Sequence, residues 1–265
     1  MLLFRIFIYL CIFFIIFHLL TRKFINPYTL IMVFGKKGSG KSTYLSSVAQ
    51  SHLRRGWQVF STVAIQGTVL FNPSEFGYRK FPEKSVILID EVSLIWSNRD
   101  FKKWDKNVEA AFRMQRHYKW KIYLFSQSFD VDKKIRDLTD SMYLLKKFAR
   151  VWSVVRKIDK RVTVSQPQTD DDGNQKNGAL VEDYRFAPII FPDALHFLFI
   201  PHWIGFHDSF SQDLELRECS NVLIPYTNSQ ERKITLHGWF MAQIKQFLHN
   251  ALHKVQTLRK PESNS

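Results

Sequence analysis

A glycine-rich segment with the sequence GKKGSGKS carries the residue types that bind phosphate groups. Its glycines allow consecutive backbone N–H groups to turn toward phosphate oxygens, and a helix that begins within the segment adds partial positive charge. Lys41 can reach the β- and γ-phosphates of a nucleotide, and the hydroxyl of Ser42 can ligate Mg²⁺. The segment therefore predicts a nucleotide site bound by Gly35, Lys36, Lys37, Gly38, Ser39, Gly40, Lys41, Ser42 and Thr43.

Two adjacent carboxylates, Asp90 and Glu91, follow the apolar segment SVILI about 50 residues after the phosphate-binding segment. At such a position the first carboxylate can hold Mg²⁺, usually through water, and the second can polarise an attacking water molecule. We therefore expect Asp90 and Ser42 at the metal, Glu91 as the catalytic base, and Lys41 on the transferred phosphate. Acidic residues at a strand end are otherwise solvated or cap the next helix, but the spacing favours the catalytic interpretation.

Gln127 ends another apolar segment, in IYLFSQS, and is the third polar candidate. At that sheet edge it would lie between the phosphate-binding segment and the two carboxylates, where its amide could contact the γ-phosphate or the attacking water. An ordinary exposed amide is an equally good interpretation of this residue taken alone. Guanine-recognition signals of the NKxD type are missing, which favours ATP over GTP.

These motifs together resemble the zonula occludens toxin (Zot) and filamentous-phage assembly protein I-like ATPases, a family related to the FtsK/HerA pumping ATPases. The resemblance covers residues 29–145, under half of the chain, and rests on GKKGSGKS and ILIDE in the order seen in P-loop enzymes. Its more discriminating part is the succession of Arg116, His117, Ser126, Gln127, Asp130 and Arg136.

The resemblance implies further roles for polar residues outside the phosphate-binding segment. Gln127 would be a polar sensor of the nucleotide, and Arg116, or its neighbour Arg113, would be a finger supplied to the ATP of an adjacent subunit. A solvated helix face is the alternative interpretation of both arginines, since basic residues on helices usually have that role. In the family the membrane helix follows the ATPase domain, whereas here an apolar segment precedes it.

Strand and helix signals alternate after residue 28, which predicts an α/β fold with a P-loop parallel sheet and right-handed crossovers. Apolar runs predict buried strands at residues 29–34, 58–63, 85–89 and 121–125. Helices are expected at residues 41–54, 107–117 and 131–139.

The sequence after about Ser141 changes to β-branched and aromatic segments, at residues 143–148, 151–156 and 161–165, and TDDDGNQKNG suits a long hairpin loop. Near the carboxyl end, apolar residues recur with helical spacing, which predicts an amphipathic helix. We expect four regions: an anchor at 1–23, a P-loop core at 29–145, a β-rich extension at 146–210 and a helical region at 211–265. The helical stripe comprises Phe240, Ile244, Phe247, Leu248, Ala251, Leu252, Val255 and Leu258.

The chain has 265 residues, of which 38 are Lys or Arg and 24 are Asp or Glu, giving a net charge of +14. This excess favours polyanionic partners, either nucleic acid or anionic lipid, without choosing between them. The two cysteines, Cys11 and Cys219, exclude a disulfide framework and suit a reducing compartment.

The segment from Leu2 to Leu20 is apolar and long enough, as a helix, to cross a bilayer core of about 30 Å. A cleaved signal peptide is the competing interpretation, but no small-residue cleavage pattern follows Leu20. Arg22 and Lys23 outweigh Arg5 on the other flank, so the positive-inside rule places the following domain in the cytoplasm. We expect a single-pass protein of the inner membrane.

These observations predict a membrane-anchored, homo-oligomeric ATPase that powers filamentous-phage-type virion assembly and extrusion. Its partners would be phage coat or export proteins, membrane lipid and, in one version, DNA. Two alternatives stay open: a conjugation-type or FtsK-like DNA translocase, and a nucleotide-regulated membrane scaffold that does not hydrolyse ATP.

Overall fold

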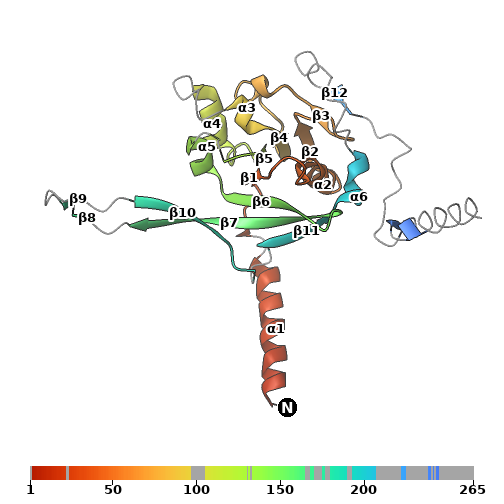
Figure 1. Cartoon of the computed structure of the whole chain (residues 1–265), viewed down its shortest axis with the longest axis vertical. Coiled ribbons are helices and arrows are strands. Elements are labelled where there is room, and N and C mark those ends of the chain that lie inside the picture. The colour runs from red at the N-terminus through yellow and green to blue at the C-terminus, as the bar shows by residue number, and fades with distance from the viewer. Residues whose placement is uncertain are drawn as a thin grey trace, which may run out of the picture.

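A single large sheet forms the centre of the molecule, with helices on both faces and one long helix extending away from it (Figure 1). The computed structural model describes residues 2–21, 24–96, 105–129, 131, 133–164, 168–169, 175–176, 180–189, 193–206, 222–224, 238–239, 241 and 243–244. The helices are α1 (Leu2–Thr21), α2 (Lys41–Leu53), α3 (Val92–Ile95), α4 (Lys106–Met114), α5 (Lys133–Leu138) and α6 (Ile200–Trp203), with 3₁₀ turns at Pro73–Glu75 and Ile204–Phe206.

Ten of the described strands belong to this sheet, in the order β10-β7-β6-β1-β5-β4-β2-β3-β12, with β11 also paired to β7. The strands from β6 to β3 in this order run parallel, and β7, β10, β11 and β12 are antiparallel additions at the two sides. The predicted α/β fold with a parallel-dominated P-loop sheet is therefore confirmed. The strands are β1 (Leu30–Phe34), β2 (Gln58–Ser61), β3 (Val69–Leu70), β4 (Ser85–Ile89), β5 (Trp120–Ser126), β6 (Ser141–Phe148), β7 (Trp152–Val164), β8 (Gln168–Thr169), β9 (Gln175–Lys176), β10 (Leu180–Phe186), β11 (Leu195–Phe199) and β12 (Val222–Leu223).

The central strands are buried on both faces because helices cover both sides of the sheet. Every residue of β1 and β4 is buried, which explains why these strands read as continuous apolar runs and not as alternating patterns. On one face Met32 packs with Phe112 of α4 and Ile135 of α5, and on the other face Val33 packs with Leu45 of α2. The two hydrophobic clusters fix the register of the strands, since a slip of one residue would exchange the two faces.

The outer strands extend beyond this helix-covered region. β7 is one continuous strand over Trp152–Val164, where the sequence predicted two separate segments. β7 pairs antiparallel with β6, to which a tight turn connects it, and antiparallel with β10. The segment between β7 and β10 contains β8 and β9, so the predicted long hairpin is present. We call the sheet and the helices that cover it the head. In Figure 1 the β7–β10 ribbon projects sideways from this head. The boundary expected after residue 145 falls within β6.

Helix α1 stands apart from the sheet, and its described side chains are exposed along most of its length. Residues 4–21 have a mean hydropathy of 2.3, so α1 is long and apolar enough to cross a membrane. A signal sequence would meet the same criterion. Of the predicted carboxyl-terminal helical stripe only Ile244 is described, and the other members, like Cys219 and Asp130, lie outside the described residues.

Candidate functional site

The phosphate-binding loop connects the end of β1 to the start of α2 and occupies the carboxyl edge of the parallel sheet. Lys41, the first residue of α2, is buried, and its ammonium group donates a hydrogen bond to the carbonyl of Gly35 at 2.9 Å. This contact folds the lysine back over the loop. Lys36, Lys37 and Gly38, at the outer turn of the loop, are exposed.

Two glycines of the loop have backbone conformations that other residues rarely adopt. Gly38 has φ +75°, and an added Cβ there would meet nothing within 4 Å, so space stays open above the loop. Gly40 has φ +96°, and an added Cβ would lie 2.4 Å from the Oγ of Ser153. Gly40 is therefore required both by its positive φ and by the close approach of a neighbouring strand.

That neighbouring strand is β7, which lies outside the P-loop core predicted from the sequence. The hydroxyl of Ser153, a fully buried residue, donates a hydrogen bond to the carbonyl of Ser39 at 2.7 Å. Leu145 of β6 also lies close to the loop: a Cβ added at Gly35 would be 3.1 Å from the Cβ of Leu145. The β6–β7 hairpin therefore supports the phosphate-binding loop from the side.

The two carboxylates stand at the carboxyl end of β4, as the sequence predicted. The backbone N–H of Asp90 donates to the hydroxyl of Thr62, at 2.9 Å, and the Oδ1 of Asp90 accepts from the backbone N–H of Glu91, at 3.0 Å. Glu91 has φ +50° and ψ +48°, a left-handed conformation that costs a non-glycine residue about 1 kcal/mol or more. This turn directs the Glu91 side chain toward β5.

Gln127 meets Glu91 at this edge. β5 lies between β1 and β4 in the sheet, so the residue that follows it falls between the phosphate-binding loop and the carboxylates. The Nε2 of Gln127 donates to the Oε1 of Glu91 at 2.5 Å. The structure thus places Lys41, Asp90, Glu91 and Gln127 along one edge, although 86 residues separate the first from the last in sequence.

Asp90 is less acidic than an ordinary aspartate. Burial, followed by the negative charge of Glu91, raises the pKa of Asp90 to about 6, while the backbone N–H of Glu91 and the charge of Lys41 act in the opposite direction. The influence of Lys41 on Asp90 is itself evidence that the two halves of the site are close. A divalent cation at this position would stabilise the ionised carboxylate.

Arg116 is not part of this cluster. It lies in the exposed turn between α4 and β5, at the amino end of β5, whereas Gln127 follows the carboxyl end of the same strand. Arg113, on α4, pairs with Glu109 at 2.8 Å. In one copy of the chain, therefore, neither arginine reaches the nucleotide edge, and a finger role would require an adjacent copy.

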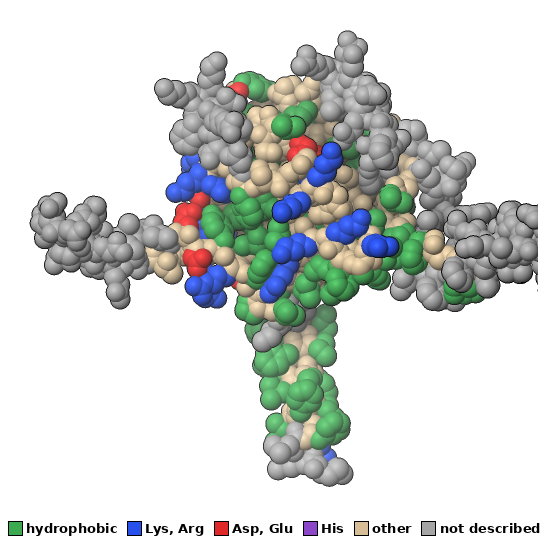
Figure 2. Space-filling model, viewed as in Figure 1, with side chains coloured by type: hydrophobic (Ala, Val, Ile, Leu, Met, Phe, Trp, Pro, Cys, Tyr) green, Lys and Arg blue, Asp and Glu red, His purple; other side chains and the backbone are tan. Residues whose placement is uncertain are grey.

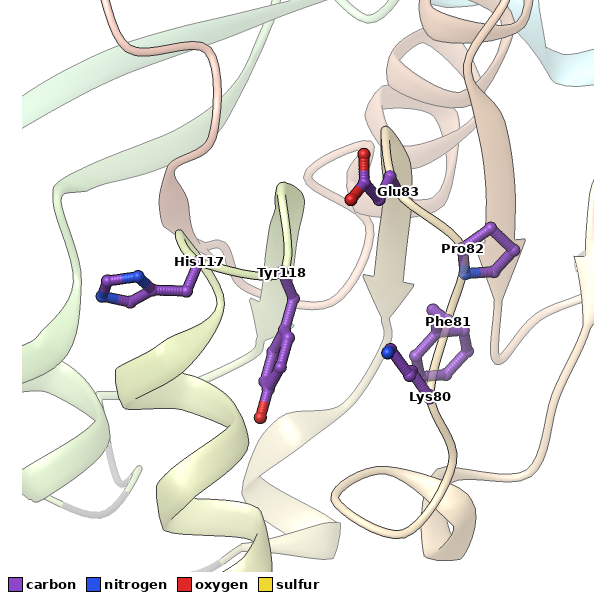
Figure 3. Close-up of a pocket in the computed structure, with 6 residues that line it drawn as sticks. All are labelled: Lys80, Phe81, Pro82, Glu83, His117 and Tyr118. Carbon is purple, nitrogen blue, oxygen red and sulfur yellow. The ribbon is translucent and has the colours of Figure 1, made fainter.

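A pocket of about 340 Å³ opens beside this turn, at the amino ends of β4 and β5 (Figure 3). Figure 3 shows His117 and Tyr118 on one side of it and Lys80, Phe81, Pro82 and Glu83 on the other. It lies at the sheet edge opposite the phosphate-binding loop, so it is not the nucleotide site.

The residues of the phosphate-binding edge fit a triphosphate with Mg²⁺. The buried hydroxyl of Ser39 has no hydrogen-bond partner among the described residues, and an unsatisfied buried donor is costly unless a ligand completes it. The open space at Gly38 and the half-buried Ser42 at the start of α2 leave room for phosphate oxygens. When bound, Mg²⁺ would supply positive charge to the β- and γ-phosphates, held by Ser42 and Asp90.

Two residues of this edge were missed by sequence reasoning. Thr62 follows β2 at the carboxyl edge, and a scan for polar residues at strand ends could have found it. Ser153 had no signal in the sequence, because its contact with Ser39 joins residues 114 apart through the β6–β7 turn.

The sheet order and the edge residues together define a P-loop nucleoside triphosphatase. A family model described as Zonular occludens toxin (Zot) matches residues 72–182, a range that contains Asp90, Glu91, Arg116 and Gln127. The predicted resemblance to the Zot family is confirmed over this range. No curated protein matches it significantly in sequence.

Solved structures with related folds share little sequence with this chain. The N-terminal domain of zonular occludens toxin from Neisseria meningitidis is 16% identical, covers 49% of this chain and 83% of its own, and has a TM-score of 0.41. The genome packaging NTPase B204 from Sulfolobus turreted icosahedral virus 2, in complex with ATP-gammaS, is 13% identical over 58% of this chain and 98% of its own, with a TM-score of 0.39. The flagellar accessory protein FlaH from Methanocaldococcus jannaschii is 15% identical over 49% and 77%, with a TM-score of 0.35. At these TM-scores the similarity carries no argument about function.

Proposed function

We propose that this chain hydrolyses ATP and uses the energy for transport at a membrane. The observation that carries the proposal is the contact between the Nε2 of Gln127 and the Oε1 of Glu91, at 2.5 Å, on the edge that also holds Lys41 and Asp90. A site that only bound nucleotide would need the loop and its lysine, but not a carboxylate held by a sensor amide next to the position of the γ-phosphate.

In this mechanism the loop N–H groups and Lys41 hold the phosphates and stabilise the negative charge that develops in the transition state. Glu91 accepts a hydrogen bond from the attacking water and polarises it. Gln127 holds the Glu91 carboxylate through its amide N–H, and it can report the presence of the γ-phosphate to β5. Asp90 and Ser42 are the protein groups available to the metal.

The test of hydrolysis compares Glu91→Gln with wild type in ATP turnover and ATP binding. We expect turnover to fall by about 100-fold or more, with the Kd for ATP changed little, because the amide cannot act as a base. Lys41→Ala is the matched control for binding and should lose ATP affinity. A Glu91→Gln protein with wild-type turnover would show that Glu91 is not the base, and a wild type without turnover would favour the nucleotide-regulated scaffold.

We further propose that α1 anchors the protein in the inner membrane, with the sheet domain in the cytoplasm, and that the ATPase drives phage-type virion assembly and extrusion. The length and composition of α1 and its exposed apolar side chains support anchoring. Carbonate extraction and protease protection of the full chain test it. Phage assembly predicts that Lys41→Ala protein stays in the membrane while virion release stops.

The net charge of +14 favours one alternative, a DNA translocase. Stimulation of ATP turnover by DNA, weakening steeply as salt rises, would support that function over virion assembly. Light scattering of the detergent-solubilised chain with ATP and Mg²⁺ tests the oligomer that an arginine finger at Arg116 requires.

A further inference from the structure

One side of the sheet is open and lies next to the end of α1. It consists of β10, β11 and the connection between them, of which residues 187–189 and 193–194 are described. In Figure 1 β11 and the described start of this connection lie along the base of the head, on the side from which α1 extends. Residues 24–29 lead from α1 into β1, at the centre of the sheet.

This open side carries bulky apolar side chains that face water in the isolated chain. The exposed fractions are 42% for Phe186, 65% for Ile189 and 60% for Phe197, and on the segment after α1 they are 77% for Phe24 and 60% for Ile25. Figure 2 shows apolar side chains continuing from α1 onto the base of the head. We name these five residues the basal patch. Exposed apolar side chains gathered on one part of a surface are typical of an interaction site.

Strand pairing places a cation beside the basal patch. Directly paired residues lie on the same face of a sheet, and Phe186 is paired with Ile158 while Phe197 is paired with Val154. Arg156 lies between those two positions on β7, and its guanidinium stacks over the ring of Phe186 at 4.1 Å. Arg185, the neighbour of Phe186 on β10, points to the opposite face of the sheet and pairs with Asp183 at 2.7 Å. Arginine beside aromatic rings is a combination suited to the interface between lipid head groups and acyl chains.

The linker limits how far the head can lie from a membrane that holds α1. Eight residues, 22–29, separate the end of α1 from β1, and fully extended they would span at most about 28 Å. The side chain of Tyr28 packs on Trp57 with 5.9 Å between ring centroids, which fixes the end of the linker on the head and shortens this reach. One face of the head must therefore oppose the bilayer.

We propose that the basal patch rests in the head-group layer of the anionic bilayer that α1 spans, with Arg156 directed at lipid phosphates. This inference rests on the proposed anchoring by α1 and adds which face of the ATPase the membrane covers. The nucleotide edge is then left free toward the cytoplasm. A lipid surface fits better than a protein partner because the patch continues the apolar surface of α1 and carries Arg156 at its margin.

The test uses the full chain in nanodiscs, in a Cys11→Ala, Cys219→Ser background, with single nitroxide labels. Phe197→Cys and Ile189→Cys report the basal patch, Phe13→Cys reports α1, and Leu94→Cys, 83% exposed on α3, is the water-exposed control. Collision rates with oxygen, which concentrates in lipid, and with a water-soluble nickel chelate are measured in discs of phosphatidylcholine with and without phosphatidylglycerol. ATP turnover of each labelled protein reports its fold.

With phosphatidylglycerol present, we expect the oxygen-to-nickel ratio at both basal-patch labels to exceed that at Leu94→Cys several-fold, and to fall toward it in pure phosphatidylcholine. Ratios equal to the Leu94→Cys control, with Phe13→Cys in lipid, would overturn the inference and leave the anchor intact. If the Phe13→Cys label is also in water, the anchor itself is wrong. Protection from both reagents would indicate a protein partner, and a ratio independent of phosphatidylglycerol would remove the anionic requirement.

Discussion

The inner and outer parts of the sheet are built differently. Strands β1, β5, β4 and β2 are parallel and covered by helices on both faces, and the candidate catalytic residues follow their carboxyl ends. Strands β7, β10 and β11 are antiparallel, less covered, and carry exposed aromatic side chains. The candidate catalytic residues therefore lie on the strands that helices cover from both faces, while the outer strands are free to contact other surfaces. The exception is Ser153, through which the outer part touches the phosphate-binding loop.

The largest expected effect on stability comes from Asp90, in the inner part. Because the pKa of Asp90 is about 6 in the folded chain, against 3.8 for an ordinary aspartate, the folded state holds a proton between pH 4 and 6 that the unfolded state has released. By linkage, the free energy of unfolding should fall by about 3 kcal/mol as the pH rises through this window, and stay low above it. Asp90→Asn should remove this slope. Denaturant unfolding of both proteins with EDTA checks it, and parallel pH curves would contradict it.

Gly40→Ala tests the contact between the two parts more directly. The added Cβ would require φ +96° and would collide with the Oγ of Ser153, so we expect a loss of about 2 kcal/mol in stability and a large loss of ATP affinity. The double variant Gly40→Ala, Ser153→Gly should lose the collision but keep the strain of the positive φ, so only part of the lost stability should return. Thermal unfolding and ATP titration measure both effects, and an unchanged Gly40→Ala protein would mean that β7 does not constrain the loop.

Ser153→Ala should have a smaller effect. It leaves the buried carbonyl of Ser39 without its 2.7 Å donor, which costs about 1 kcal/mol. We expect the KM for ATP to rise several-fold with little change in kcat, because the loop is positioned less firmly. Val162→Ala is the matched control, since Val162 lies on the same strand but is 58% exposed and distant from the loop. Equal KM values for the two variants would make Ser153 merely structural.

The smallest effect is expected where the projecting ribbon meets α5. Lys160 of β7 pairs with Asp137 of α5 at 2.6 Å, at a partly exposed position. Lys160→Ala should reduce stability by about 0.5 kcal/mol, and less at high salt, where exposed ion pairs are screened. ATP turnover should not change. Chemical denaturation at two salt concentrations measures this change. A loss of stability larger than that caused by Ser153→Ala would contradict the prediction that the Lys160 ion pair contributes less than the Ser153 hydrogen bond.

The sequence predicted the inner part well because each of its signals is local. A continuous apolar run such as SVILI is typical of a strand covered on both sides, and the glycines and lysine of the loop lie within eight consecutive residues. The outer part was predicted less well: β7 was divided in two, because Arg156, Lys157 and Asp159 interrupt its apolar pattern. Those charges are tolerated since the strand is only partly buried and Lys157 pairs with Asp193 at 2.6 Å.

The roles assigned to individual site residues stay predictions, although the structure brings Lys41, Asp90, Glu91 and Gln127 to one edge. The arginines illustrate the limit of sequence spacing. Arg116 is only 11 residues from Gln127, but a seven-residue strand lies between them and places them at opposite edges of the sheet.

The phosphate-binding loop, the strand-end carboxylates and the apolar amino-terminal helix could be predicted from sequence, because each depends on the order of neighbouring residues. The contacts of Gln127 with Glu91, of Ser153 with Ser39 and of Arg156 with Phe186 were visible only in the folded chain. These contacts arise from strand order and register, which are set by how the hydrophobic faces of distant segments pack together.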